Sequence, residues 1–259
     1  MKSFEHLMPG RNEADAKTEK AAARIGELQD VMYAEGRRSL LVVLQGMDAS
    51  GKDGAVRKVF DAVNPTGVQV TSFKSPTSED LKHDFLWRVH ARVPARGYIG
   101  VFNRSHYEDV LIVRVHAEQL LPPELRKNER DEWARRYKLI NNFEGTLADV
   151  GTRVVKFFLH ISKEEQRERF IARQKDPAKH WKLAAGDFVE RTFWDDYQQA
   201  YEKMLPDTST QTAPWYIIPA DRKWVRNYFL SHILVAILEE MDPRPPELAD
   251  KSLVRRRFK

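Results

Sequence analysis

The stretch "SLLVVLQGMDASGKDG", residues 39–54, decides the fold class. An apolar segment runs into Gly46, and Gly51 with Lys52 completes the spacing G-x-x-x-x-G-K of a phosphate-binding loop between a strand and a helix. In such a loop the backbone N–H groups and the N-terminus of the following helix face the anion, and the lysine adds a positive charge. The residues predicted to bind phosphate or nucleotide here are Gly46, Met47, Ala49, Ser50, Gly51, Lys52, Asp53 and Gly54.

Two carboxylates set this loop apart from the ordinary pattern. The position after the lysine normally holds Ser or Thr, whose hydroxyl contacts a magnesium ion. Here it holds Asp53, and Asp48 places a second carboxylate inside the loop. Negative charges would weaken a loop that only binds phosphate, because like charges repel. The two carboxylates therefore need an explanation beyond phosphate binding.

Further apolar runs repeat the pattern of the first strand along the chain. The five predicted strands are "LLVVLQ" at 40–45, "VQVTSF" at 68–73, "YIGVFN" at 98–103, "TRVVKFFLHI" at 152–161 and "WYIIP" at 215–219. Nearly continuous apolarity is typical of strands buried on both faces of a parallel sheet. The four predicted helices between and after them span residues 52–63, 78–93, 130–150 and 222–241. This alternation predicts an α/β fold with a doubly wound parallel sheet of five strands flanked by helices.

The chain is predicted to form a single domain over residues 1–259. A helical N-terminal extension covers 1–38, the core covers 39–161 and 206–240, and a basic tail covers 241–259. Residues 162–205 are strongly charged and helix-compatible, with no strand signal, so they are predicted to form a helical lid. The polar residues 1–20 and the tail are expected to be partly ordered arms.

Composition restricts the chemistry that the chain can perform. The 259 residues include no cysteine, which excludes disulfides, thiolate zinc sites and cysteine nucleophiles. The histidines lack metal-ligand spacing, so His106 is expected to be structural. A net charge of +5 favours an anionic partner, although many basic proteins simply carry a solvated charged surface. No apolar run approaches the ~20 residues that span a bilayer, and no apolar signal segment opens the sequence, so we expect a cytoplasmic protein.

The end of the third predicted strand departs from the usual pattern in a second way. An ordinary phosphate-loop protein holds magnesium with an aspartate in this region, but the strand ends in Asn103. Arg104, Glu108 and Asp109 follow within two turns if the segment is helical. Ligands of doubly wound sheets bind outside the carboxyl ends of the strands, so we expect these residues to face the phosphates. The alternative is a solvated Glu-Asp pair at 108–109.

Four cations of the predicted lid are candidates for phosphate contacts. Arg169 and Arg173 lie one turn apart on a helix, and Lys179 and Lys182 follow the break at Pro177. A solvated helix with i,i+4 ion pairs explains the two arginines equally well. A phosphoryl transferase, however, needs cations over the transferred group and must exclude water from it.

Several motifs together resemble those of the polyphosphate kinase 2 family. They are "GMDASGKDG", "VNPTGVQVTSFKSPT", "LWRVH", "GYIGVFNRSHYEDVLIVRV", "HISKEEQRERF", "DPAKHWK" and "APWYIIPADRKW", in order between about residue 20 and about residue 240. The resemblance implies a thymidylate-kinase-like fold with a helical lid, and phosphoryl transfer between inorganic polyphosphate and nucleotides with magnesium. The form Asn-Arg-Ser-His-Tyr-Glu-Asp resembles the subgroup called class III, which implies both AMP and ADP as acceptors, and ATP as a product. A homodimer or homotetramer is also implied.

The resemblance and the residues lead to one set of hypothetical roles. The predicted catalytic residues are Asp48, Lys52, Arg104, Asp109, Arg169 and Arg173; Asn103, Lys179 and Lys182 are predicted to bind phosphate. The predicted ligands of Mg²⁺, or of Mn²⁺ in its place, are Asp48, Glu108 and Asp109. Guanine nucleotides are further candidate acceptors. The alternatives are an ATP-dependent nucleoside or nucleotide kinase and a non-catalytic polyanion or nucleic-acid binder; neither a membrane nor nucleic acid is the predicted partner.

Overall fold

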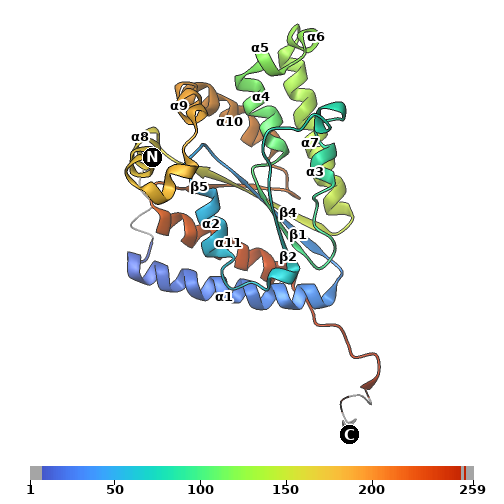
Figure 1. Ribbon diagram of the computed structural model, residues 1–259. Helices are drawn as coiled ribbons and strands as arrows, with labels where there is room; N and C mark the ends of the chain where they lie inside the picture. Colours follow the sequence, from blue (N-terminus) through green and yellow to red (C-terminus); the bar gives the residue numbers. More distant parts are fainter. Residues whose placement is uncertain (1–7, 252–253, 255–259) are drawn as a thin grey trace.

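The computed structural model describes residues 8–251 and 254, and the predicted five-stranded parallel sheet lies at its centre (Figure 1). The strands are β1 (Ser39–Gln45), β2 (Val68–Ser72), β3 (Ile99–Asn103), β4 (Thr152–His160) and β5 (Trp215–Pro219), in the order β2-β3-β1-β4-β5. Every residue of β1 is buried, which explains its unbroken apolar sequence. The edge strand β2 is half-buried or exposed along its length.

Helices cover both faces of the sheet, as Figure 1 shows. One layer holds α1 (Arg11–Glu35), α2 (Lys52–Val59) and α11 (Lys223–Met241), and the other holds α4 (Ile112–Val115), α7 (Glu129–Asp149) and α10 (Trp194–Thr208). The shorter elements are η2 (Pro65–Gly67), η3 (Asp80–Lys82), α3 (Trp87–His90), η4 (His106–Val110), α5 (Ala117–Leu120) and α6 (Pro123–Arg126). The predicted doubly wound α/β fold is confirmed. In the described part of the chain, no helix is long and apolar enough to cross a bilayer.

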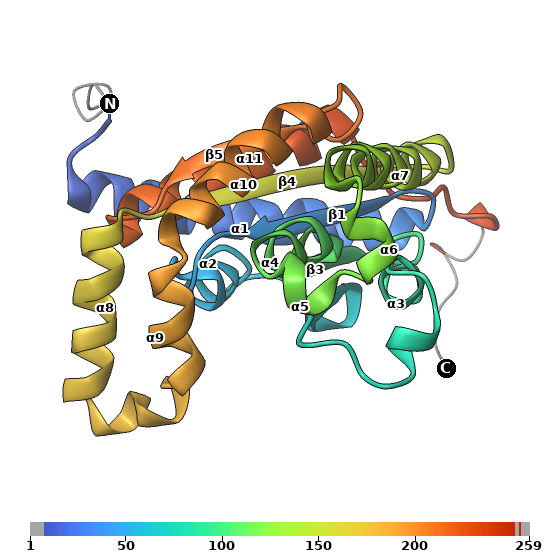
Figure 2. The same ribbon diagram turned by 90° about the horizontal axis from the view of Figure 1, so that it is seen from above.

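The predicted lid segment divides into two parts with different surroundings. Helix α8 (Lys163–Lys175), the turn η5 (Pro177–Lys182) and helix α9 (Ala185–Thr192) project from the core as a hairpin (Figure 2). Ser162 caps α8 by accepting a hydrogen bond from the Glu165 N–H. Helix α10 instead packs on α7 and α4 and buries its apolar side in the core.

Two expectations from the sequence are wrong in part. Residues 11–20 belong to the long helix α1 and are not a partly ordered arm; small and apolar residues such as Ala14 and Ile25 bury one side of α1, which packs against α11. Residues 1–7 lie outside the described part. The helix predicted over 78–93 is reduced to η3 and α3, because the Asp84 side chain accepts a hydrogen bond from the Leu86 N–H and favours a local turn.

The topology places the candidate site at the carboxyl edge of the sheet. Strand β1 lies between β3 and β4: β2 and β3 lie on one side of it, and the connection from β3 to β4 crosses to the other side, so the strand order reverses at β1. Leu44 of β1 is in register with Asn103 of β3, and the loop after β1 therefore lies beside the segment after β3. This is the crevice in which doubly wound proteins bind ligands.

Candidate active site

The loop after β1 has the backbone of a phosphate-binding loop. Three of its residues have positive φ angles: Gly46 at 153°, Ala49 at 62° and Gly51 at 96°. A Cβ atom on Gly51 would lie 1.9 Å from a guanidinium nitrogen of Arg226, so this position requires glycine. The following helix α2 begins at Lys52, which directs the N-terminal end of the helix toward the loop.

Lys52 is folded back into the loop. Its ammonium group donates hydrogen bonds to the carbonyl oxygens of Gly46 at 2.6 Å and Met47 at 3.2 Å. Burial and the neighbouring Arg104 lower the pKa of Lys52 to about 8, although Asp48 opposes this shift. An incoming phosphate would favour the protonated form of Lys52 and strengthen the contact between them.

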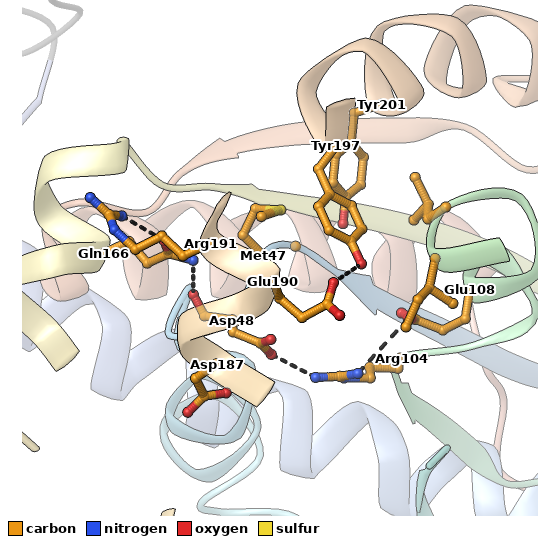
Figure 3. Close-up of a pocket in the computed structure, with 13 residues that line it drawn as sticks. Met47, Asp48, Arg104, Glu108, Gln166, Asp187, Glu190, Arg191, Tyr197 and Tyr201 are labelled. Atoms are coloured by element: carbon orange, nitrogen blue, oxygen red, sulfur yellow. Dashed lines mark hydrogen bonds and ion pairs between the residues drawn. The ribbon is translucent and has the colours of Figure 1, made fainter. Parts of the chain in front are cut away.

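Asp48 joins the loop to the segment after β3. The Arg104 guanidinium donates a hydrogen bond to an Asp48 carboxylate oxygen at 2.6 Å, and its other terminal nitrogen lies 3.9 Å from the Glu108 carboxylate (Figure 3). Arg104 has a φ angle of 63°, which is unusual for a residue with a side chain. The side chains of Asp48 and Arg104 remain 28% and 37% exposed, so a ligand can reach both.

Asp53 joins the loop to the lid. One of its carboxylate oxygens accepts a hydrogen bond from the Asn103 amide at 2.8 Å, and the other accepts one from the Lys182 ammonium at 3.0 Å. Three residues predicted from the sequence therefore meet, although they come from α2, β3 and η5. The acid after Lys52 thus binds a lid cation in this structure.

Two cavities meet at Asp48, Arg104 and Asp187. The larger one, of about 660 Å³, lies between the loop, residues 72–75 at the end of β2, and the lid. Its lining includes Lys52, Asp53, Asn103, Arg173, Trp181 and Lys182. The smaller one, of about 50 Å³, lies between Met47, Glu108, the lid helix α9 and two tyrosines of α10 (Figure 3). The smaller compartment has room for a phosphate-sized group, which would then lie beside a ligand in the larger one.

The lid cations predicted from the sequence have different environments. Arg173 lines the larger cavity, 3.9 Å from Asp187. Arg169 lines neither cavity: its guanidinium donates hydrogen bonds to the carbonyl oxygens of Ala49, Ser50, Ala220 and Asp221 and to the Glu165 carboxylate. Lys179 pairs with Asp176 at 2.5 Å and is more than half exposed, outside both linings. Arg173 and Lys182 are therefore the predicted lid cations that reach the cavities.

Of the two acids after β3, only Glu108 lines a cavity. The carboxylate of Asp109 lies in neither lining, and burial raises the pKa of Asp109 to about 6 although Arg88 and Arg136 favour its charged form. Its backbone carbonyl accepts a hydrogen bond from Arg136 at 2.8 Å. The predicted contact of Asp109 with a metal ion therefore stays a prediction.

Sequence reasoning missed several residues of the site. They are Gln166, Asp187, Glu190 and Arg191 of the lid, Tyr197 and Tyr201 of α10, and Arg226 of α11. Burial and the nearby Asp48 raise the pKa of Asp187. Arg226 lies behind the loop, and burial together with Arg169 lowers the pKa of Arg226 to about 10. The charged spacing "DFVER" at 187–191 resembles any solvated helix, so no sequence signal pointed to it.

The acids of the site are suited to a magnesium ion whose remaining ligands come from water and substrate. Within residues 8–251 and 254, no three His, Asp or Glu side chains are grouped closely enough to hold a metal ion by themselves. Magnesium is commonly bound by one or two carboxylates, with waters and substrate phosphates as its other ligands. Asp48 and Glu108 line the same cavity and face the same guanidinium, so together they match this donor set.

Comparisons with known proteins agree with this geometry. The model of the family described as Polyphosphate kinase 2 matches residues 9–246. The AMP/ADP-polyphosphate phosphotransferase of Meiothermus ruber is 52% identical over 233 residues, which cover 89% of this chain and 84% of that protein. The ADP-polyphosphate phosphotransferase of Rhodopseudomonas palustris is 48% identical over 227 residues, covering 86% and 78%. The crystal structure of polyphosphate kinase 2 from Arthrobacter aurescens TC1 matches with a TM-score of 0.89 and 43% identity, covering 96% of this chain and 86% of that one.

Proposed function

Since the chain belongs to the polyphosphate kinase 2 family, we propose that it transfers a phosphoryl group reversibly from inorganic polyphosphate to AMP and to ADP. The observation that carries this proposal is the meeting of two cavities at Asp48 and Arg104, between a phosphate-binding loop and a basic lid. A donor and an acceptor that both end in phosphate can meet there. The names of the relatives support polyphosphate as donor and AMP or ADP as acceptor.

The chain's own groups meet the main needs of phosphoryl transfer, which are positioning and neutralisation of charge. The loop N–H groups and Lys52 bind phosphate oxygens, and Arg104 lies where the transferred group passes from one cavity to the other. Arg173 and Lys182 bring positive charge from the lid, which also excludes water from the group. Asp48 would orient the acceptor phosphate through a bound cation and need not act as a base, because that phosphate is already ionised at neutral pH.

Magnesium is the proposed cofactor, with manganese as a substitute. Asp48 and Glu108 would hold it, with the role predicted for Asp109 tested below. When bound, the ion reduces the repulsion between the donor and acceptor phosphates. This role would explain why a phosphate loop carries an acid, because Asp48 would supply a ligand for the cation.

A donor comparison tests the proposal and separates it from its alternatives. The protein is incubated with magnesium and AMP, ADP, GMP or GDP, with either polyphosphate or ATP as sole donor, and products are separated by chromatography. We expect ADP and ATP to form from AMP with polyphosphate as donor. Faster transfer from ATP would instead support a nucleoside or nucleotide kinase. Salt-sensitive binding of polyanions with no turnover would support a non-catalytic binder.

Two further properties are proposed from the family likeness and the substrates. We propose a homodimer or homotetramer, which light scattering of the purified protein would test. A cytoplasmic location is proposed because AMP and ADP are metabolites of that compartment. Guanine nucleotides are proposed as further acceptors, and the GMP and GDP arms of the donor comparison test this.

A further inference from the structure

A fully buried group of ionisable residues lies outside both cavities, between the sheet and α7. Lys156 of β4 donates hydrogen bonds to the Tyr107 hydroxyl at 2.8 Å, to the Thr208 carbonyl oxygen at 2.7 Å and to the Glu144 carboxylate. The Tyr107 hydroxyl in turn donates to Glu144 at 2.9 Å, and a ring nitrogen of His106 lies 3.2 Å from the same carboxylate. All five residues are completely buried. None of them can touch a ligand in the cavities.

Stability alone is a weak explanation for this group. The cost of removing an ammonium and a carboxylate from water offsets most of their attraction, and apolar residues of similar volume often stabilise a fold as well. Burial lowers the pKa of Lys156 even though Glu144 is beside it, which shows that its charge is poorly solvated. What such a network does provide is a single geometry, because each of its hydrogen bonds has a direction.

The geometry that it determines is that of the segment after β3. Arg104 has an unfavourable positive φ angle, which persists only where the surrounding structure holds it. On its C-terminal side, the Ser105 hydroxyl accepts hydrogen bonds from Gln45 at 3.1 Å and from the Tyr107 N–H at 3.2 Å. His106 and Tyr107 then bond to Glu144. The anchored residues 105–107 therefore lie directly between Arg104, which bonds Asp48, and Glu108, which pairs with Arg104.

We infer that the buried Lys156–Glu144 pair is a positioning device that acts through Tyr107 and His106 to hold Arg104 and Glu108 in the phosphate site. The pair also contacts α10, because Lys156 donates a hydrogen bond to the carbonyl of Thr208, the last residue of that helix. Helix α10 supplies Tyr197 and Tyr201 to the smaller cavity. None of these network residues is a catalytic residue. The effect of the network on turnover rests on the proposed function, whereas its effect on the position of Arg104 does not.

The first test removes one hydroxyl from the network and keeps its ring. Tyr107→Phe is compared with Tyr137→Phe, which removes another buried hydroxyl, bonded to Arg114 and outside the network. With polyphosphate and ADP, we expect Tyr107→Phe to lower kcat about tenfold, because small displacements of positioning groups lower the rate strongly. The KM for ADP and the melting temperature should change little. Tyr137→Phe should retain kcat within about twofold.

A double-mutant cycle shows whether the network acts through Arg104. In an Arg104→Ala background, assayed at higher enzyme concentration, adding Tyr107→Phe should lower kcat by less than about twofold. An equal tenfold loss in both backgrounds would overturn the inference. If Tyr107→Phe lowers the melting temperature strongly, the neutral pair Lys156→Met with Glu144→Gln takes its place in the cycle. Full turnover of that pair would also overturn the inference.

A measurement without turnover separates this inference from the proposed function. The side-chain N–H signal of Arg104 is assigned in a ¹⁵N-arginine-labelled protein by its loss in Arg104→Lys. We expect this signal to shift or broaden in Tyr107→Phe and to stay unchanged in Tyr137→Phe. An unchanged signal in both variants would contradict the positioning role whatever the substrates are. A changed signal in a protein without polyphosphate-dependent transfer would contradict only the proposed function.

Discussion

Asp109→Asn should stabilise the folded protein at neutral pH. Burial raises the pKa of Asp109 to about 6, from an ordinary value of 3.8, against the attraction of Arg88 and Arg136. Each pKa unit corresponds to about 1.36 kcal/mol, so the ionised carboxylate costs the fold up to about 3 kcal/mol at pH 7.5. A neutral amide of the same shape avoids that cost. For a chain of this length, the expected rise in melting temperature is about 5–10 °C.

The gain in stability from Asp109→Asn should depend on pH. Below about pH 4, Asp109 is protonated in both the folded and unfolded states, and its burial then costs nothing electrostatic. Between pH 4 and 6 the unfolded state releases its proton first, so the cost grows as pH rises and is complete above about pH 6. At pH 5 the gain from Asp109→Asn should therefore be about half of its value at pH 7.5.

The assay is thermal unfolding at pH 5 and pH 7.5, followed by circular dichroism. Asp61→Asn is the matched control, since Asp61 is exposed, and we expect it to change the free energy of unfolding by less than about 0.5 kcal/mol at either pH. An unchanged free energy of unfolding at pH 7.5, or an equal stabilisation at both pH values, would refute the reasoning.

The Asp109→Asn variant also tests the predicted metal role. An acid retained at a cost to stability is a mark of function, so we expect turnover to fall on the order of a hundredfold.

Four other substitutions separate catalysis from support of the loop. Asp48→Asn should lower polyphosphate-dependent turnover of ADP on the order of a hundredfold, and a loss below tenfold would exclude the metal-ligand role. Arg173→Ala should lower turnover at least tenfold while the melting temperature changes by about 2 °C or less, since its side chain faces a cavity. Arg169→Ala should instead lower the melting temperature by several degrees, because its guanidinium binds four backbone carbonyls; an unchanged melting temperature would contradict this. Gly51→Ala should both destabilise the fold and weaken phosphate binding, because its Cβ would displace Arg226; a normal KM for polyphosphate would count against it.

The sequence predicted those parts of the fold that depend on local pattern. Continuous apolarity identified the strands, since both faces of the sheet are covered, and the spacing of Gly46, Gly51 and Lys52 identified the loop. The prediction of one helix over 78–93 was wrong. Apolar spacing does not account for the Asp84 side chain, which accepts a hydrogen bond from a backbone N–H and so competes with helix formation. The ordered start of helix α1 was missed because small residues such as alanine, which give only a weak apolar pattern, form part of its buried side.

Residues of the site that follow a strand were predictable from their position, whereas those of the lid were predicted only in part. Arg104 and Glu108 follow β3 directly, and the topology alone brings them to the loop. Arg169 and Arg173 are one turn apart with similar surroundings in sequence. Only the fold shows that one donates to the backbone of the loop and the other faces the cavity. Asp187 joins the site through the turn η5, whose direction no local pattern indicates.

The two acids of the phosphate loop have different explanations once their partners are known. Asp48 bonds Arg104 and lines both cavities, which is the basis of the metal-ligand role proposed for it. Asp53 bonds Asn103 and Lys182, so the residue after the loop lysine links the loop to the lid. A Ser or Thr side chain at that position is shorter and uncharged, so it could not form the ion pair that Asp53 makes with Lys182. The metal-ligand role proposed for Asp48, five residues earlier in the loop, therefore does not depend on the side chain at position 53.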